Sequence, residues 1–508
     1  MRSQTARSAR LAGAGVIGVA ALAVLAAAAG PDVRVIEAVK SGNREIARVL
    51  LQQRVDATSR EVDGTTALHW AARADDVEMV QLLLRAGAQV DAANRYGLTP
   101  LSLAATNGGA GVMAALLEAG ANPNGTQPAG ETVLMTAART GSPEAVRLLL
   151  GRGADVHAKE GGFGEDALMW AAADDHAAVI ELLVASGADL NATATVLEFP
   201  KVKVDAATMV VTALPRGGLT PLMYAARQGS LAAAGALSKA GADLNRTDPD
   251  GMTAMVIAVI NAHYDVAALL AEQGGDPEIG DVSGMAALYA AVDMHTLDPL
   301  INRPPPRTTG QMDAVDFVKA LLARRVNPNP PLRAPLLARQ HNGGDGTLGA
   351  GATPLMRAAK NADVTLMRVL IEHGADPNRA TRAGMTPLLF AMGPGRRKSA
   401  QDTLEAVRIC LDGGANVQAT NENGETPLHA AVGQSEALVR LLVEKGARLD
   451  AKDKLGRTPL DVALGVGAAA GRGGRGGRGA ATGGPRVDMA ALLRELMARD
   501  TVKNPVVQ

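Results

Sequence analysis

Three kinds of residue are scarce in this chain, and each scarcity excludes something. Cysteine occurs once, at Cys410, so no internal disulfide can form. Aromatic residues make up 2% of the sequence, so the core must be built from Leu, Val, Ala and Met. The formal net charge is −1, from 51 basic and 52 acidic residues, and this balance does not indicate a nucleic-acid-binding protein.

Catalytic and metal-binding motifs are absent as well. The sequence has no His-Glu-x-x-His pattern, no Cys-x-x-Cys, no Gly-x-Ser-x-Gly elbow and no Walker phosphate loop. The segment nearest to a phosphate loop, residues 393–399, lacks the glycine that would precede Lys398. No two of the eight histidines have the spacing of a metal site. We therefore expect no catalytic site, no metal and no cofactor.

The chain does contain one phrase, Gly-x-Thr-x-Leu-x-x-Ala, that returns about every 33 residues. It opens at Gly64, Gly97, Gly130, Gly164, Gly218, Gly251, Gly284, Gly351, Gly384, Gly424 and Gly456. The longer intervals keep the same order of landmarks around inserted residues. Self-similarity at this period indicates a stack of one small structural repeat, and hence one elongated domain.

Each repeat has the landmarks of two short helices and a hairpin-like turn. A threonine two residues after the opening glycine is suited to cap the first helix, and proline often follows it. The capping residues are Thr66, Thr99, Thr132, Asp166, Thr220, Thr253, Thr353, Thr386, Thr426 and Thr458. A second apolar run ends at a glycine suited to the left-handed conformation after a helix. These glycines are Gly87, Gly120, Gly153, Gly187, Gly241, Gly274, Gly374, Gly414 and Gly446.

This pattern resembles the ankyrin repeat, whose Thr-Pro-Leu-His-x-Ala phrase is matched by residues 426–431 and almost as well by residues 66–72. The resemblance extends over residues 32–500. It implies an all-α solenoid of about twelve helix-turn-helix repeats with hairpin-like connecting turns. It also implies a concave surface that binds a protein partner, without indicating which one.

The repeats predict the following division of the chain. Residues 1–29 are a signal peptide or membrane anchor, 32–63 an N-terminal capping repeat, and 64–455 the ankyrin repeats, with insertions at 197–217, 296–311, 331–350 and 393–400. Residues 456–500 form a C-terminal capping repeat with a Gly/Arg-rich loop at 465–485, and residues 501–508 are a tail. We interpret the Gly/Arg-rich tract as a loop rather than an RNA-binding box, because it lacks interleaved aromatic residues.

Two departures from the pattern mark irregular places. Arg54 and Arg325 stand where the glycine after the second helix belongs, at a cost of roughly 1–2 kcal/mol if they adopt the left-handed conformation. Ala286 replaces a capping threonine in the same repeat as Arg325. We expect residues 284–350 to be the weak joint of the stack.

The N-terminus has the features of an export leader. Arg2, Arg7 and Arg10 precede an uncharged stretch, residues 11–29, that ends in three alanines. We expect cleavage near Ala29 and a periplasmic or secreted protein. The alternative is an inner-membrane anchor formed by residues 11–29, because 19 residues are long enough to span a bilayer. Membrane contact is expected only through such an uncleaved leader.

The candidate partner-binding residues share three positions of the repeat. Six residues after the opening glycine, at position +6, the chain places Trp70, Trp170, Tyr224 and Phe390; just before the glycine, at position −1, it places Tyr96 and Phe163; at position +9 it places Arg73, Arg139, Arg227 and Lys360. Aromatic side chains are favoured interface anchors. Together these sets predict a groove for an apolar, mildly acidic protein partner.

Plainer interpretations stay open for the same residues. Position +6 holds Leu103 and Ile257 in other repeats, so its aromatic residues can also be core. The cations at position +9 can simply face the helix dipole. Cys410 is expected to be a small buried apolar residue, and His69 and His429 to be structural hydrogen-bonding residues. The Asp174–Asp175–His176 cluster is expected to be hydrated.

The predicted function is a non-enzymatic interaction scaffold for a protein of unknown identity. The insertions are a second candidate for binding, because long loops on a rigid scaffold often carry specificity. An exported effector or a toxin-neutralising inhibitor is the alternative and would use the same surface. An enzyme, which would have to be built on the repeats themselves, is the residual class.

Overall fold

The structure is a computed structural model, and it describes residues 32–197, 217–296, 308–336, 348–393, 398–466 and 488–503. Its contacts divide the chain into two compact parts, which we call the N-terminal part (Met1–Ala194) and the C-terminal part (Thr195–Gln508). The boundary lies beside the insertion predicted at 197–217. The leader, residues 467–485 of the Gly/Arg-rich loop, most of the insertions at 197–217, 296–311 and 331–350, and half of the insertion at 393–400 lie outside the described residues.

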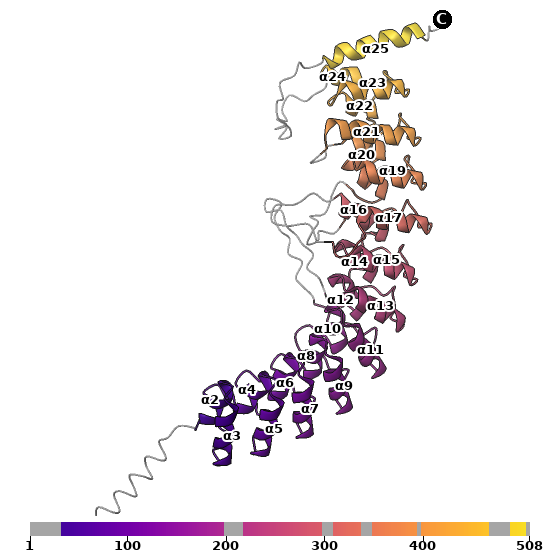
Figure 1. Cartoon of the computed structure of the whole chain (residues 1–508). Coiled ribbons are helices and arrows are strands. Elements are labelled where there is room, and N and C mark those ends of the chain that lie inside the picture. Colours follow the sequence, from indigo (N-terminus) through magenta and orange to yellow (C-terminus); the bar gives the residue numbers. More distant parts are fainter. Residues whose placement is uncertain are drawn as a thin grey trace, which may run out of the picture. The chain divides into compact units, whose positions relative to one another are not determined.

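Among its described residues, the N-terminal part contains five helix pairs (Figure 1). Its first helices are α2 (Arg34–Lys40), α4 (Ala67–Arg73), α6 (Pro100–Thr106), α8 (Val133–Thr140) and α10 (Ala167–Ala173). Its second helices are α3 (Arg44–Gln52), α5 (Val77–Arg85), α7 (Ala110–Glu118), α9 (Pro143–Gly151) and α11 (Ala177–Ala185). Each first helix contacts the next first helix and its own second helix, so the pairs form two layers.

In the ranges that the structure describes, the C-terminal part repeats this arrangement in seven pairs. Its first helices are α12 (Pro221–Gln228), α14 (Ala254–Ile260), α16 (Ala287–His295), α18 (Pro354–Lys360), α20 (Pro387–Met392), α22 (Pro427–Ala431) and α24 (Pro459–Ala463). Its second helices are α13 (Leu231–Lys239), α15 (Tyr264–Glu272), α17 (Ala314–Ala323), α19 (Val364–Glu372), α21 (Ala400–Asp412), α23 (Glu436–Glu444) and α25 (Met489–Lys503). The described residues therefore contain the twelve helical repeats that the sequence predicts.

The helix boundaries follow from local chemistry. Eight of the predicted threonines accept a hydrogen bond from the backbone amide three residues on, and Asp166 does the same in its repeat. Each such cap stabilises its helix by about 1 kcal/mol. Ala286 offers no side-chain cap to α16, as expected.

The chain turns after each second helix through a left-handed residue. Gly87 has φ +90° and Gly446 φ +91°, and the other predicted glycines adopt similar values. Arg54 (φ +61°) and Arg325 (φ +63°) adopt the same conformation without being glycine. The predicted backbone strain is therefore present at both arginines.

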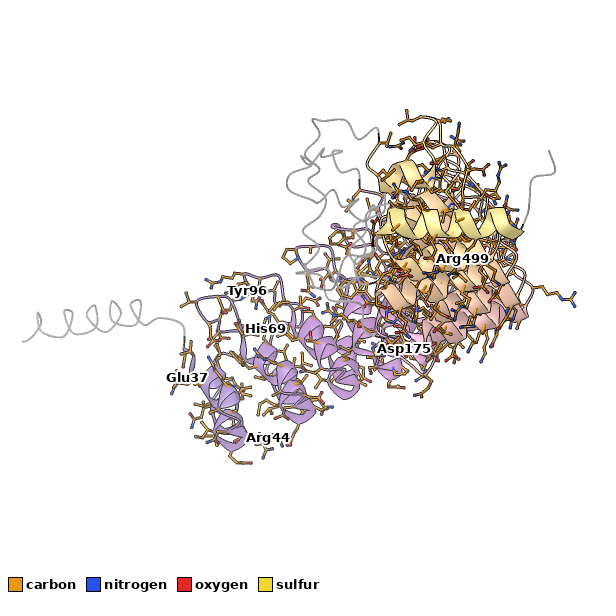
Figure 2. The ribbon with its side chains drawn as sticks, turned by 90° about the horizontal axis from the view of Figure 1, so that it is seen from above. Glu37, Arg44, His69, Tyr96, Asp175 and Arg499 are labelled. Carbon is orange, nitrogen blue, oxygen red and sulfur yellow. The ribbon has the colours of Figure 1, made fainter. Side chains whose placement is uncertain are left out.

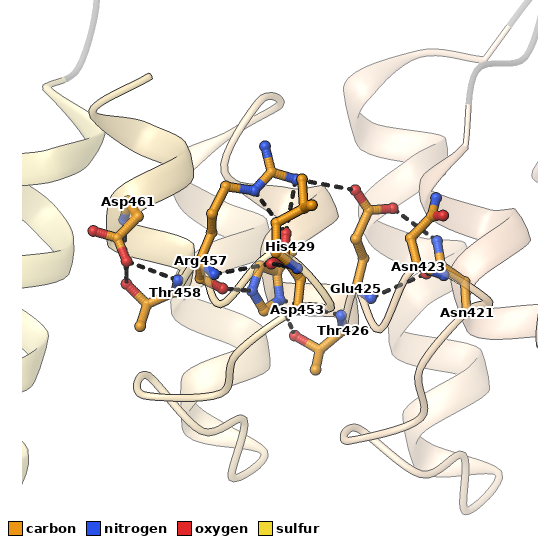
Figure 3. Close-up of polar contacts among 10 residues, drawn as sticks. Asn421, Asn423, Glu425, Thr426, His429, Asp453, Arg457, Thr458 and Asp461 are labelled. Carbon is orange, nitrogen blue, oxygen red and sulfur yellow. Dashed lines mark hydrogen bonds and ion pairs between the residues drawn. The ribbon is translucent and has the colours of Figure 1, made fainter. Parts of the chain in front are cut away.

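Neighbouring hairpins are joined through their backbones. The amide of Arg95 donates to the carbonyl of Asp63 (2.8 Å), and the amide of Lys454 donates to the carbonyl of Asn423 (2.9 Å). Isolated bridges such as Arg60 with Thr66 close single hairpins. Figure 3 shows the last two hairpins, where side chains from adjacent turns form one polar network.

The core lies between the two helix layers and is mostly aliphatic. The leucine of the repeated phrase is at most 1% exposed at Leu68, Leu101, Leu134, Leu168, Leu222, Leu288, Leu355, Leu388 and Leu428. Cys410 is fully buried, as predicted, and burial raises the pKa of its thiol to about 12. In the described ranges, no helix combines the length and the apolar character needed to cross a membrane.

Candidate partner-binding surface

Packing of consecutive first helices brings positions +9 and +6 together. The last turn of one first helix lies beside the middle of the next, so a cation at position +9 reaches the ring at position +6 of the following repeat. Nζ of Lys40 lies 4.5 Å from the ring centroid of Trp70, and the guanidinium carbon of Arg139 lies 4.7 Å from that of Trp170. Cation–π contacts of this kind contribute about 0.5–2 kcal/mol, depending on how far they are desolvated.

Trp70 is held by a complete polar cluster. Its Nε1 donates to Oε2 of Glu61 (2.9 Å), while Nζ of Lys40 donates to Oε1 of the same carboxylate (3.1 Å). Arg73 lies 5.7 Å from the ring centroid on its own helix. The ring itself remains partly exposed. A carboxylate of the chain therefore bridges the indole and the cation.

Trp170 also has a cation over its ring, Arg139 in the place of Lys40, but no such bridge among the described residues. It is partly exposed, yet its Nε1 is closed to solvent and has no hydrogen-bond partner among the described residues. The side chain of Arg139 is exposed. An unpaired buried donor costs about 1–3 kcal/mol, so this indole carries an unsatisfied group at the surface of the stack.

The other two aromatic residues at position +6, Tyr224 and Phe390, were predicted as partner-binding residues but differ from the tryptophans in burial. Tyr224 and Phe390 are each only 5% exposed, so they pack as core residues, which was the alternative interpretation. Arg227 is half-buried with its guanidinium 4.7 Å from the Tyr224 ring, and Lys360 is half-buried as well. Neither aromatic ring is available as an exposed anchor.

Lys398, which sequence reasoning considered only for its phosphate-loop likeness, belongs to the environment of Phe390. Its Nζ donates to the carbonyl of Gly393 (2.8 Å), to that of Phe390 (3.4 Å) and to that of Ala391. Burial lowers the pKa of this ammonium to about 8. The lysine thus satisfies the last carbonyls of α20, and its place in an insertion left no repeat signal to reveal it.

The two aromatic residues at position −1 lie at hairpin tips. Tyr96 is 53% exposed and Phe163 58% exposed, whereas His69 in the same stack is fully buried (Figure 2). The guanidinium of Arg95 lies 4.9 Å from the Tyr96 ring and donates to its hydroxyl (2.6 Å). Val62 is also exposed at a tip, and counting only aromatic residues missed it.

A buried ion pair occupies the same two positions elsewhere in the chain. Asp293 stands at position +9 of its repeat and Arg357 at position +6 of the next, and Nε of Arg357 donates to Oδ1 of Asp293 (2.6 Å). Their side chains are 5% and 7% exposed. Applying the repeat register to charged residues as well as aromatic ones would have revealed this pair.

The histidines of the repeated phrase are structural, as predicted. The backbone amide of Thr66 donates to Nδ1 of His69 (3.1 Å), whose Nε2 donates to the carbonyl of Leu98 (2.9 Å). Burial is the main cause that lowers the pKa of His69. His429 forms the same contacts with Thr426 and with the carbonyl of Arg457 (Figure 3).

His176 and His263 form a second structural set that the sequence reasoning did not identify. Nε2 of His176 donates to the carbonyl of Arg139 (2.9 Å), and Nε2 of His263 donates to that of Arg227 (3.1 Å). Asp174 and Asp175 are exposed, as expected. In the ranges that the structure describes, no group of His, Cys, Asp and Glu side chains could hold a metal ion.

Comparison with known proteins agrees with this geometry. Profiles described as ankyrin repeats in three copies match residues 35–127, 111–194, 203–281, 222–298 and 397–469, and a profile of ankyrin repeats in many copies matches residues 355–401. Together they cover well over half of the chain. The chain belongs to the ankyrin repeat family.

One curated relative of this ankyrin protein is the human Neurogenic locus notch homolog protein 4. The two are 40% identical over 85 residues, which are 17% of this chain and 4% of the relative. The chain thus covers only a small fraction of that relative's length. This likeness supports the ankyrin fold, and ankyrin repeats are generally protein-interaction modules.

Proposed function

We propose that this ankyrin protein is a non-enzymatic scaffold that binds a protein partner on the face formed by its first helices and hairpin tips. The observation that carries the proposal is the placement of Trp70 and Trp170, both partly exposed and each in contact with a cation of the preceding repeat. Tryptophan and arginine are the residues most enriched among interface anchors. Family membership supports the same class of function.

The N-terminal part carries most of the proposed surface. It contains both tryptophans and both exposed tip aromatics, Tyr96 and Phe163, whereas the aromatic residues at position +6 of the C-terminal part are buried. We therefore assign the principal partner contacts to the first helices α4 and α10 and to the hairpins that carry Tyr96 and Phe163. The cations Arg73 and Arg139 make this face suited to an acidic partner.

We further propose that the protein works in the periplasm or outside the cell. Support comes from the sequence: three arginines precede the uncharged stretch 11–29, which ends in small residues. N-terminal sequencing of the protein recovered from each cell fraction tests this. A protein that stays in the cytoplasm with Met1 intact would contradict it.

Replacement of both tryptophans by alanine tests the surface. The partner is first identified by affinity capture from the exported fraction and mass spectrometry, and its affinity is then measured with purified components. We expect W70A/W170A to raise the Kd at least about 30-fold, because an anchor residue contributes about 2 kcal/mol or more. Unchanged affinity would exclude this face.

The second helices provide a matched control. Ile46 and Val49 are exposed apolar residues on α3, 51% and 47% exposed, and lie outside the proposed face. The variant I46A/V49A removes comparable apolar surface and should bind the partner like the wild type. Equal losses in the two double variants would indicate general destabilisation instead of a contact at the tryptophans, so thermal unfolding is measured for both.

A further inference from the structure

The two tryptophans of the chain occupy equivalent positions of the repeat, but only Trp70 has a carboxylate of the described residues bonded to its indole N–H. At Trp70 the chain supplies three parts: the indole N–H, the cation Lys40 and the carboxylate of Glu61 that bridges them. At Trp170 it supplies the indole N–H and the cation Arg139. The Glu61 carboxylate beside Trp70 therefore shows which chemical group the site at Trp170 is suited to bind.

The missing carboxylate has a local cause in the hairpin before α10. The amide of Glu61 pairs with the carbonyl of Thr65, four residues on, whereas the amide of Glu160 pairs with that of Glu165, five residues on. The repeat that opens at Gly130 is 34 residues long, one more than the usual 33. Glu160 is thus the structural equivalent of Glu61 in a hairpin with one extra residue.

The extra residue changes what this glutamate contacts. The carboxylate of Glu160 accepts from the amides of Gly162 (2.5 Å), Phe163 (2.5 Å) and Glu165 (3.1 Å) and is 8% exposed. Burial on its own raises the pKa of this carboxyl, but the hydrogen bonds from the backbone amides outweigh it and lower the pKa overall. Glu160 is therefore committed, as a carboxylate, to its own loop.

Two polar groups are left to recruit an acceptor. Among the described residues, Nε1 of Trp170 is closed to solvent without a hydrogen-bond partner, and the guanidinium of Arg139 forms no ion pair. Arg139 is exposed and its guanidinium carbon lies 4.7 Å from the centroid of the Trp170 ring, so a carboxylate that pairs with Arg139 is brought close to the indole. A hydrogen bond between charged groups or to a charged group contributes about 1.5–3 kcal/mol.

We propose that an Asp or Glu side chain of a protein partner docks at Trp170 and Arg139, in the place that Glu61 occupies beside Trp70. The carboxylate accepts from Nε1 of Trp170 and pairs with the guanidinium of Arg139. This inference rests on the proposed scaffold function, because it names the chemistry of the partner at that face. Trp70 does not take such a group, because the chain's own carboxylate already fills its site.

The two indole N–H groups allow a direct test in one spectrum. The full-length protein is labelled with 15N in its tryptophan rings, which gives two indole signals, and W70F assigns them. The probes are an all-glutamate tetrapeptide with acetylated and amidated ends, the matching all-glutamine tetrapeptide, which is uncharged, and sodium acetate at equal carboxylate concentration. We expect the glutamate peptide to shift the Trp170 signal downfield and to leave the Trp70 signal in place.

Variants of single residues sharpen this test. R139Q should raise the Kd for the glutamate peptide at least about tenfold, while R147Q, on the second helix α9, should leave it unchanged. In E61A the same peptide should begin to shift the Trp70 signal, because that site then also lacks its carboxylate. Thermal unfolding of each variant identifies any change that comes from loss of folding.

Three outcomes would overturn the inference: no shift of the Trp170 signal by the glutamate peptide, equal shifts by both peptides, or no new Trp70 response in E61A. If sodium acetate shifted the Trp170 signal as much as the glutamate peptide does, the site would bind free carboxylates in general, and the assignment to a side chain of a protein partner would be wrong. If the Trp170 signal fails to respond while W70A/W170A still loses the native partner, this inference is wrong and the scaffold function stands. A native partner that binds W70A/W170A like the wild type excludes the proposed binding face itself.

Discussion

The joint between α8 and α10 and the joint between α16 and α18 use the same two repeat positions in opposite ways. In the first, Arg139 lies over the partly exposed ring of Trp170; in the second, Asp293 and Arg357 form a buried ion pair. The geometry is common to both because consecutive first helices pack in the same register. The difference teaches that the register determines which residues meet, while their chemistry determines whether the contact is partly exposed or buried.

The joint between α16 and α18 also has a second set of polar contacts. Nδ1 of His295 donates to Oδ2 of Asp363 (2.5 Å), and the side-chain amide of Asn361 donates to the carbonyl of Thr296 (2.6 Å). These contacts accompany the repeat with the missing cap at Ala286 and the strained Arg325. Whether this repeat is the weak joint stays a prediction, and the polar contacts make it testable.

The largest expected effect is the loss of one partner of the buried ion pair. Arg357→Ala leaves Asp293 as a buried charge without its guanidinium partner and should destabilise the C-terminal part by about 3–5 kcal/mol. Hydrogen exchange of α16 and α18, followed by mass spectrometry, measures this loss. The double variant D293L/R357M should recover most of it, because apolar replacement of a whole buried pair is often close to neutral.

Tryptophan fluorescence tests whether the N-terminal part is unaffected by the loss of this ion pair. Both tryptophans lie in the N-terminal part, so their emission follows the unfolding of that part. We expect R357A to leave the emission midpoint in urea unchanged while protection in α16 and α18 falls. An equal shift of the emission midpoint would contradict a local role for the ion pair.

The sequence predicted the local parts of this structure and missed the parts that depend on neighbours. Capping residues such as Thr66 and turn glycines such as Gly87 act through the backbone of their own repeat, so their roles could be read from spacing. Exposure at position +6 could not, because Trp170 and Tyr224 hold the same place and differ in what surrounds them.

Contacts between residues far apart in the sequence were also missed by the sequence-based prediction. Asp293 and Arg357 are 64 residues apart across two insertions, so only the repeat register connects them. The unpaired indole of Trp170 was equally hidden, because one extra residue in a hairpin redirects Glu160 away from it. Repeat spacing indicates such an insertion but not the contacts that the redirected side chain forms.

A moderate effect is expected from relieving the backbone strain in the repeat of α16 and α17. Arg325→Gly places glycine at a left-handed position (φ +63°) and should stabilise the C-terminal part by roughly 1–2 kcal/mol through relief of strain. Part of this gain is offset, because glycine also increases the conformational entropy of the unfolded chain. The midpoint of urea unfolding measured by circular dichroism tests this. Arg325→Lys keeps both the charge and a side chain at the same φ and should leave the midpoint unchanged; a gain in that variant would show that the effect does not come from relief of the backbone strain.

The same change in the N-terminal part tests whether the joint is special. Arg54 has the same conformation (φ +61°) at the end of α3, so Arg54→Gly should give a similar gain, followed there by tryptophan fluorescence. If residues 284–350 are the weak joint, R325G should also raise the cooperativity of unfolding, while R54G should not. Equal changes in cooperativity would remove the distinction between the two regions.

The smallest effect concerns pH, and its sign should differ between the two regions. The hydrogen bond to Asp363 is the main cause that raises the pKa of His295 above 6.5, and the charge of Asp313 acts in the same direction. The folded state therefore holds this proton more tightly than the unfolded chain, so the contribution is complete below pH 6.5 and is lost as the pH rises through the raised pKa. For a partly exposed pair we expect less than about 1 kcal/mol.

His69 has the opposite linkage, because burial is the main cause that lowers its pKa below 6.5. The neutral ring is favoured in the folded state, so its contribution is present above pH 6.5 and is lost as the pH falls through the lowered pKa. When the pH is lowered from 8 to 5.5, unfolding followed by tryptophan fluorescence should show that the N-terminal part becomes less stable. Over the same change, the protection of α16 and α19 against hydrogen exchange, corrected for the intrinsic exchange rate, should increase. His295→Gln should abolish only the second trend. A parallel change in both regions, or a trend in α16 and α19 that survives H295Q, would assign the pH response to groups other than this pair.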